Sequence, residues 1–394
     1  MPRVLRIMNR LNLGGPTYNA CYLTKYLAPE FETLLVAGMK DNSEASSEFI
    51  AEGMGIAPRY LQNMRRELNF ANDLSSFYEL KKIIREYKPD IVHTHAAKSG
   101  ALGRLAASAL HVPVIVHTFH GHVFHSYFGK LKTEFFIKTE RFLAKKCSAI
   151  VAISNKQKDE LANVYKICPS EKISVIPLGF ELERFRQNKD IKRKVFREKY
   201  FLKEDELAIG IVGRLVPIKN HELFLTAFKK VSEMTTKKIR AFIIGDGELR
   251  NETENVAKLL GLEVSIDGNT SSRAAVVFTS WIREIDVALA GIDIIAMSSL
   301  NEGTPVSLIE AQAAGKPIIS TRTGGVEDIV MEGKTALLSE NNNLVEFTEK
   351  LLLLVENEKL RNEFSVSGWK NADEKFNVSI LTENMRRLYQ RLLK

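Results

Sequence analysis

The 394-residue chain lacks several features that would assign it to other classes of protein. It has three cysteines, Cys21, Cys147 and Cys168, and no Cys-x-x-Cys spacing, so neither a disulfide framework nor a thiolate metal site is indicated. No uninterrupted apolar stretch is long enough to span a bilayer. Arginines interrupt the N-terminal segment where a signal peptide needs apolar residues. We therefore expect a cytoplasmic protein.

Other absences narrow the function. The chain contains no internal repeat, no low-complexity tract and no heptad run, which excludes solenoids and coiled coils. Its basic residues come without a recognisable nucleic-acid module, so we expect no nucleic-acid partner. No Asp-x-Asp sequence occurs, so a metal ion bridging a diphosphate would have no obvious ligands. We expect neither a metal ion nor another cofactor.

Short β-branched runs alternate with helix-length amphipathic stretches in both halves of the chain. This alternation is typical of α/β folds with doubly wound parallel sheets. A content of 45% hydrophobic residues is enough to fill two cores. The predicted strands are Val4–Ile7, Leu34–Ala37, Ile91–Thr94, Val114–Thr118, Ala149–Ile153, Val175–Ile176, Ala208–Val212, Ala241–Ile244, Val276–Thr279, Ile292–Met297 and Ile318–Ser320.

Two further segments bear on the domain organisation. Between the halves, Pro177-Leu178-Gly179 and the charged stretch from Glu181 to Glu206 are typical of a linker with an irregular or helical start. At the end, Ser379 to Leu393 has apolar residues at helical spacing and should pack against another element.

The positive charge is unevenly distributed. Residues 1–180 hold 24 Lys and Arg against 16 Asp and Glu, which gives +8, whereas residues 181–394 hold 32 against 32. Within the basic half, the stretch from Tyr127 to Lys146 combines lysines with aromatic residues in a helical pattern. This stretch is either an ordinary surface helix or a docking face for anionic lipid. We expect an anionic membrane surface as a partner, and a peripheral position on the inner face of the cytoplasmic membrane.

Two carboxylates, Glu302 and Glu310, lie eight positions apart around the start of a short helix. We predict Thr304 as its N-cap, Pro305 as its first residue and Gly315 just past its end. The neighbours of Glu310 on the helix are small and mainly apolar, so burying its carboxylate is costly unless something shares its hydrogen bonds. A polyhydroxylated ligand would do so.

At this point the sequence Glu302-Gly-Thr-Pro-Val-Ser-Leu-Ile-Glu310 resembles the E-x7-E motif of the retaining glycosyltransferases of family four, which have the GT-B fold. The resemblance implies two facing, doubly wound Rossmann-like domains and a C-terminal helix that crosses back to the first domain. It implies an acceptor-side domain at 1–180, a nucleotide-sugar-binding domain at 181–376 and the returning helix at 377–394.

The resemblance also implies roles for residues that follow the predicted strands. Arg214 and Lys219 can neutralise a departing diphosphate, and the loop glycines let the backbone approach a ligand. The implied catalytic residues are His120, Arg214, Lys219 and Glu302. The implied donor-binding residues are Gly14, Gly15, Gly245, Gly303, Thr304, Pro305, Leu308 and Glu310. The implied donor is a UDP- or GDP-linked sugar.

Histidines are concentrated between positions 93 and 125. His93, His95, His117, His122 and His125 are interpreted as loop or core hydrogen-bonding residues, with a zinc site as the less favoured alternative.

The function implied is transfer of a hexose-type sugar to a hydroxyl acceptor, which we expect to be a lipid-linked glycan, in cell-surface polysaccharide biosynthesis. Two alternatives remain: a nucleotide-sugar 2-epimerase, and a non-catalytic nucleotide-sugar-binding partner protein. Many members of the family have Phe and Gly where this chain has Thr304 and Pro305, so the sugar preference stays open.

Overall fold

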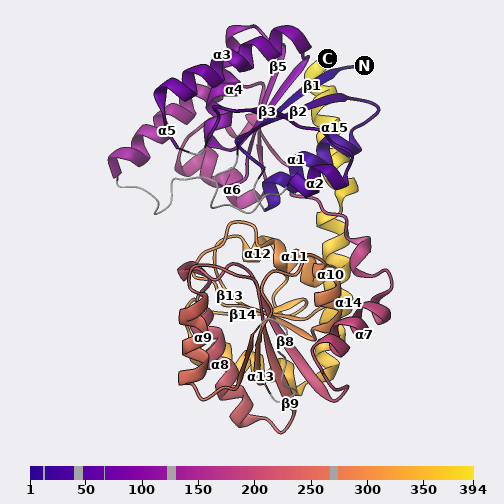
Figure 1. The fold of residues 1–394 in the computed structure, drawn as a ribbon. Helices are drawn as coiled ribbons and strands as arrows, with labels where there is room; N and C mark the ends of the chain where they lie inside the picture. Colours follow the sequence, from indigo (N-terminus) through magenta and orange to yellow (C-terminus); the bar gives the residue numbers. More distant parts are fainter. Residues whose placement is uncertain (12–13, 40–47, 66, 122–129, 267–273) are drawn as a thin grey trace. The chain divides into compact units, whose positions relative to one another are not determined.

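The computed structural model describes residues 1–11, 14–39, 48–65, 67–121, 130–266 and 274–394, with only the backbone described at 130–132. Contacts divide the chain into two compact units. The first unit comprises Met1–Phe180 and Phe376–Lys394, and the second comprises Glu181–Lys375. Each unit contains one seven-stranded sheet with helices packed around it (Figure 1).

The sheet of the first unit has the order β3-β2-β1-β4-β5-β6-β7, and every neighbouring pair is parallel. Its central strands are buried almost throughout, as strands covered on both faces are. The strands are β1 Arg3–Met8, β2 Glu32–Gly38, β3 Arg59–Leu61, β4 Ile91–His95, β5 Val114–Phe119, β6 Ala149–Ala152 and β7 Ile173–Val175.

The sheet of the second unit is also seven-stranded with all pairs parallel, but its order, β10-β11-β9-β8-β12-β13-β14, places β11 between β9 and β10. Its strands are β8 Glu206–Val212, β9 Lys238–Ile244, β10 Val264–Ile266, β11 Val276–Phe278, β12 Ile294–Met297, β13 Ile318–Thr321 and β14 Ala336–Ser339.

Helices connect the strands in both units. Those of the first unit are α1 Gly15–Tyr26, α2 Glu48–Gly53, α3 Phe70–Tyr87, α4 Ala97–Ala109, α5 Lys130–Lys145, α6 Asn155–Asp159, the π-helical turn η1 Glu160–Val164, the 3₁₀ turn η2 Ser170–Lys172 and α15 Val378–Leu393. Those of the second unit are the 3₁₀ turns η3 Glu183–Phe185 and η4 Pro217–Lys219, with α7 Lys189–Lys199, α8 His221–Met234, α9 Arg250–Leu259, α10 Ile285–Gly291, α11 Val306–Ala313, α12 Val326–Ile329, α13 Leu344–Glu356 and α14 Glu358–Phe376.

The GT-B fold class predicted from the resemblance is confirmed by this architecture and by the solved structures reported below. The predicted strands are all present. Of the expected pair Val175–Ile176, only Val175 lies in the strand, which starts at Ile173 and ends at Val175. Sequence reasoning missed β3, β10 and β14, which have three or four residues each and lie at sheet edges. Such short runs give too few alternations for a pattern to be recognised.

The segment expected to be a linker is mostly helical and belongs to the second unit. Helix α7 packs against α10, with Lys192 2.8 Å from Asp286. Arg197, which is buried, reaches Asp293 and the carbonyl of Glu206. Charge density in this stretch therefore reflects ion pairs that fasten α7 to the second unit, and the interpretation as a linker was wrong.

The C-terminal helix packs on the first unit, as predicted. The chain re-enters the first unit beside Phe180, the residue at which it leaves that unit. The amide of Phe180 donates to the carbonyl of Phe376 at 2.8 Å, and the amide of Val378 donates to the carbonyl of Phe180 at 2.9 Å. From there α15 runs along α1. Its Arg386 pairs with Glu30 at 2.7 Å, and its buried Tyr389 packs on Phe31.

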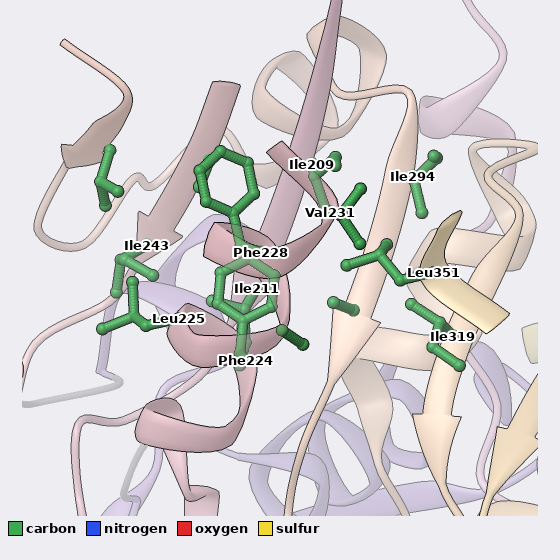
Figure 2. Close-up of a cluster of buried hydrophobic side chains, with 14 of the residues drawn as sticks. Ile209, Ile211, Phe224, Leu225, Phe228, Val231, Ile243, Ile294, Ile319 and Leu351 are labelled. Atoms are coloured by element: carbon green, nitrogen blue, oxygen red, sulfur yellow. The ribbon is translucent and has the colours of Figure 1, made fainter. Parts of the chain in front are cut away.

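Apolar side chains fill the space between each sheet and its helices. In the second unit, isoleucines of β8, β9 and β12 meet the phenylalanines of α8, with Leu351 of α13 beside them (Figure 2). Phe224 and Phe228 are completely buried. Burying one such ring contributes about 1.5 to 3 kcal/mol, so the strand ends that carry the polar loops are held rigidly. Within the described residues, no helix has both the length and the apolar composition that a membrane span requires.

Candidate active site

The strand order reverses once in each sheet, between β1 and β4 and between β8 and β12. Loops after two such strands leave toward opposite faces of the sheet, and ligands of doubly wound folds bind in the crevice that this leaves at the carboxyl ends. The loops after β8 and β12 carry Arg214, Lys219 and Glu302. The loops after β1 and β5 carry Gly14, Gly15 and His120.

Lys219 and Glu302 form an ion pair in the second unit. Lys219 ends the turn η4 after β8, and its Nζ contacts Glu302 Oε1 in the loop after β12. Ser299 Oγ donates to the same carboxylate oxygen at 2.7 Å. The two charged side chains are 21% and 12% exposed, so the pair is partly shielded from water. The structure thus brings together two of the predicted catalytic residues.

Arg214 lies close to Lys219 in the sequence, but its surroundings differ from those of the Lys219–Glu302 pair. It follows the end of β8 and is exposed. Within the described part of the chain, no side-chain partner of Arg214 is found. An exposed guanidinium without a carboxylate partner is free to bind a phosphate in a bidentate way.

The glycine turn after β9 packs directly on the loop that carries Arg214. A Cβ at Gly245 would lie 2.0 Å from the carbonyl oxygen of Gly213, and one at Gly247 would lie 2.4 Å from that of Leu215. Backbone hydrogen bonds join the two loops, from Gly213 to Ile244 and from Leu215 to Asp246, both at 3.0 Å. Gly245 is therefore required to hold the Arg214 loop in place.

The start of α11 differs from the prediction. The helix begins at Val306, Pro305 is the N-cap residue with extended backbone, and no side chain caps the helix. Thr304 is therefore not the N-cap, and Pro305 is not the first helical residue. Without a capping side chain, the amides of the first turn have no partner from a cap. They are the groups that an anion or sugar hydroxyl can bind.

Gly303 and Leu308 flank this helix start and behave differently. A Cβ at Gly303 would meet nothing within 4 Å, so space lies above the loop. Leu308, by contrast, is completely buried. Its amide donates to Pro305 at 3.0 Å and its carbonyl accepts from Gln312 at 3.3 Å. Leu308 thus supports the helix from the core and offers a ligand no free polar group.

The loop that carries Glu302 is held by the adjacent glycines Gly324 and Gly325, for which no role was predicted from the sequence. A Cβ at Gly324 would lie 1.7 Å from the carbonyl oxygen of Glu302, and one at Gly325 would lie 2.0 Å from that of Gly303. The amide of Gly325 donates to Glu302 at 3.1 Å. Only glycine permits so close an approach, and Gly324 also has a φ of +51°. The adjacent glycines after β13 were the available signal.

Glu310 is held apart from the Lys219–Glu302 pair. The Glu310 side chain is 14% exposed, and its Oε1 lies 3.4 Å from Nη2 of Arg184, the second residue of η3. Burial raises the pKa of the Glu310 carboxyl to about 7, against a smaller lowering by Arg184. The expected cost of burying this carboxylate is therefore present in the structure. No sequence pattern pointed to Arg184, which lies 126 residues away.

In the first unit, the glycine loop after β1 leads straight into α1. Gly14 has a φ of +149° and precedes a helix that starts at Gly15, with Pro16 in its first turn and no capping side chain. The helix starts at Gly15 because Pro16 is already preset for the first turn. Its uncapped amides are a second place that favours an anion.

His120 follows β5 and meets a buried row of polar side chains. Its Nε2 lies 2.8 Å from Nδ1 of His95 on β4, and His93 Nδ1 lies 2.6 Å from the hydroxyl of Tyr389 on α15. His117 pairs separately with Thr94 at 2.8 Å. The described histidines are thus core hydrogen-bonding groups, as interpreted.

The zinc alternative finds no support where it can be examined. Among the residues that the structure describes, no three His, Cys, Asp or Glu side chains are placed to hold a metal ion. His122 and His125 lie outside the described residues.

Taken together, two doubly wound parallel sheets, cationic loops at the strand ends and a Glu-x7-Glu helix define a GT-B glycosyltransferase. Models of two families match the chain: "Glycosyl transferases group 1" over residues 192–370 and "Glycosyltransferase Family 4" over residues 13–184. A relative from Escherichia coli, UDP-Gal:alpha-D-GlcNAc-diphosphoundecaprenol alpha-1,3-galactosyltransferase, is 32% identical over 84% of this chain and 82% of its own length. The chain belongs to glycosyltransferase family 4.

Other relatives agree. A capsular polysaccharide biosynthesis glycosyltransferase of Staphylococcus aureus is 25% identical over 84% of each chain. A glycosyltransferase of Rickettsia africae has the same fold, with a TM-score of 0.81, 20% identity and coverage of 100% of this chain and 99% of the other. An Anabaena protein crystallised with UDP and glucose has a TM-score of 0.81 at 16% identity, covering 99% and 100%. The epimerase alternative gains no support, and the chain is an enzyme of the glycosyltransferase class.

Proposed function

We propose that this enzyme transfers a hexose from a UDP-hexose to a hydroxyl group of a sugar carried on a polyprenyl diphosphate, in the assembly of a cell-surface polysaccharide. The observation that carries the proposal is the partly shielded Lys219–Glu302 pair in the loops that also carry Arg214, which has no side-chain partner among the residues that the structure describes. The named donor and acceptor of the Escherichia coli relative support the choice of substrates.

The charges in these loops suit the step in which the sugar leaves its nucleotide. When the bond between the anomeric carbon and the diphosphate breaks, the diphosphate gains negative charge. Arg214 and Lys219 are preorganised cations that stabilise that charge more in the transition state than in the ground state. Lys219 is held in place by Glu302, which is itself fixed by Ser299 at 2.7 Å. On this proposal no metal ion is needed.

The remaining predicted residues divide by chemistry. Glu310 would accept hydrogen bonds from the ribose hydroxyls, since its carboxylate is largely buried and, among the described residues, is met by Arg184 at a distance of 3.4 Å. Gly303, Thr304 and the first turn of α11 would contact the sugar through backbone amides. The Gly14–Gly15 helix start would meet a phosphate. His120 would contact the transferred sugar.

A donor and acceptor panel tests the proposal. Purified enzyme is given UDP-galactose, UDP-glucose, UDP-N-acetylglucosamine or GDP-mannose, with N-acetylglucosaminyl polyprenyl diphosphate as acceptor. We expect a UDP-hexose to yield a lipid-linked disaccharide with retained α configuration at the new linkage, read by NMR. Exclusive use of GDP-mannose, or conversion of the donor to its 2-epimer without acceptor, would overturn the proposal.

The basic helix α5 supports a position at an anionic membrane. Phe135, Lys138, Phe142 and Lys145 recur at helical spacing on one face, and the two rings are 67% and 55% exposed. Glu140 faces the core instead, where it pairs with the buried Arg104 at 2.9 Å. The exposed face of α5 therefore carries one acidic side chain fewer than the sequence of the helix contains. We propose that this face docks on anionic lipid at the inner side of the cytoplasmic membrane.

Vesicle flotation tests the docking face. Four lysines of this segment, Lys130, Lys132, Lys138 and Lys145, are changed to Ser, and the matched control changes Lys194, Lys258, Lys359 and Lys370 of the second unit. Wild type and control should float with phosphatidylglycerol vesicles at low salt and release at high salt, because each Lys near the surface contributes about 1 kcal/mol that salt screens. Equal flotation of the α5 variant would show that α5 is an ordinary surface helix.

A further inference from the structure

A continuous row of buried polar side chains runs from β1 to His120. Arg6 of β1 is completely buried, and its Nη1 lies 3.0 Å from His93 Nδ1 and 3.4 Å from His95 Nε2. Within the described residues, Arg6 forms no ion pair with a carboxylate. A buried guanidinium is costly unless its hydrogens are bound, and its acceptors are the two imidazoles together with Thr24 Oγ1, which accepts from Nε at 3.3 Å.

The guanidinium fixes the direction of every bond in the row, because it can only donate. His93 Nδ1 and His95 Nε2 must therefore accept, and neither can carry a proton at that nitrogen. In His93 the proton then sits on Nε2, which donates to Thr118 Oγ1 at 2.7 Å, while the single lone pair of Nδ1 is shared by Arg6 Nη1–H at 3.0 Å and the Tyr389 hydroxyl at 2.6 Å. In His95 the proton sits on Nδ1.

The same logic extends to His120. His95 Nδ1–H points at His120 Nε2 over 2.8 Å, so this nitrogen accepts. Burial lowers the pKa of His120 to about 3 and, together with Arg6, lowers those of His93 and His95. A neutral ring that accepts at Nε2 carries its proton on Nδ1. That atom is buried and has no partner within the described residues.

We propose that Arg6, acting through His95, locks His120 in the Nδ1–H tautomer and so presents a hydrogen-bond donor to an oxygen atom of the bound sugar substrate. Arg6, His95 and Tyr389 are then positioning residues, and only His120 touches substrate. The inference rests on the proposed function for the identity of the ligand, but the tautomer itself is a property of the free protein. The other tautomer would present a lone pair, which cannot bind a ring or phosphate oxygen.

The tautomer can be read directly by NMR on the full chain with ¹⁵N-labelled histidine. Long-range ¹H–¹⁵N spectra distinguish Nδ1–H from Nε2–H rings, and the His120→Gln variant assigns the signal. We expect His120 as Nδ1–H in the wild type and a mixture in Arg6→Met. His117→Gln, which removes a buried histidine outside the row, should leave the signal unchanged. A wild-type Nε2–H ring would overturn the proposal, whatever the outcome of activity assays.

Isosteric substitutions provide a second readout if Arg6→Met fails to fold. Asn places its amide nitrogen where Nδ1 of histidine lies, and Gln places it where Nε2 lies. His95→Asn should therefore retain the lock and His95→Leu should lose it. At the ligand end, His120→Asn should keep about tenfold more kcat than His120→Gln, the effect of one hydrogen bond. Equal kcat in the two His120 variants, or Gln above Asn, would contradict a substrate-facing Nδ1–H.

Discussion

Each of the two units contains one seven-stranded, all-parallel sheet, yet they build their polar centres in opposite ways. In the first unit, Arg6, His93 and His95 are strand residues, completely buried and bound to one another. In the second unit, Arg214 and Glu302 lie in loops beyond the strand ends and keep contact with water. A strand side chain of a covered sheet is desolvated by both helix layers, whereas a loop at the carboxyl edge is not.

This difference determines what each centre can do. Neutral imidazoles held in a core keep a fixed set of donors and acceptors, which suits the recognition of hydroxyl groups. The cationic side chains in the loops of the second unit can neutralise a phosphate, which suits a departing nucleotide. The centre of the first unit therefore provides hydrogen-bonding groups of fixed orientation, and the loops of the second unit provide positive charge. Breaking each centre should have consequences of different size.

The largest effect is expected where charge is removed from the second unit. Lys219→Ala and Arg214→Ala should each lower kcat by about 10²- to 10³-fold, the cost of losing one preorganised donor. Steady-state kinetics at saturating donor measures the loss, with Lys258→Ala on the exposed side of α9 as the matched control. Thermal unfolding of each variant verifies that it is folded. Wild-type kcat in either site variant would remove that residue from the reaction.

A smaller effect separates the two centres by their response to pH. Burial raises the folded pKa of Glu310 to about 7 from the ordinary value of 4.5, so its contribution to stability is fully present below the unfolded value and is lost as pH rises through about 7. Glu310→Gln stays neutral and should be more stable than wild type at pH 8 by up to about 3 kcal/mol. Below about pH 4.5 the two should be alike.

Urea unfolding of wild type and Glu310→Gln at several pH values measures this difference. The buried histidines of the first unit, whose pKa values are lowered by burial, are the same in both proteins, so their contribution cancels in this difference. A stability difference that does not grow between pH 5 and pH 8 would show that Glu310 is not the titrating group.

The smallest effect is expected on removal of divalent cations. If Arg214 and Lys219 neutralise the diphosphate, EDTA should leave the rate of transfer unchanged. Rates are compared in untreated enzyme, in enzyme with EDTA, and after adding back Mg²⁺ or Mn²⁺. A loss of activity on chelation that either cation restores would mean that a metal ion shares the neutralisation of the diphosphate with Arg214 and Lys219. The two units would then differ only in how they position their side chains.

Local pattern was enough to predict much of the fold. The apolar runs of the central strands, the helix after Asn220 and the glycine end of α11 follow from propensities that act over a few residues. Gly315 shows this directly: its φ is +65°, its amide bonds to Gln312 and the next amide bonds to Ala311, as a helix-ending glycine should. The edge strands β3 and β10 were missed because pairing with a neighbour, more than their own three residues, makes them strands.

The residues of the site show the same division between what a local pattern predicts and what depends on tertiary structure. The sequence by itself determined which residue types follow the strands: Glu302 and Glu310 on either side of a helix start, Arg214 and Lys219 after one strand, glycines after others. Only the tertiary structure decided their partners, because each partner comes from a distant segment. Lys219 meets Glu302 across 83 positions, Arg184 meets Glu310 across 126, and His93 meets Tyr389 across 296. Burial likewise depends on packing, which no local pattern encodes, and so the shifted pKa of Glu310 and the fixed tautomer of His120 belong to the fold.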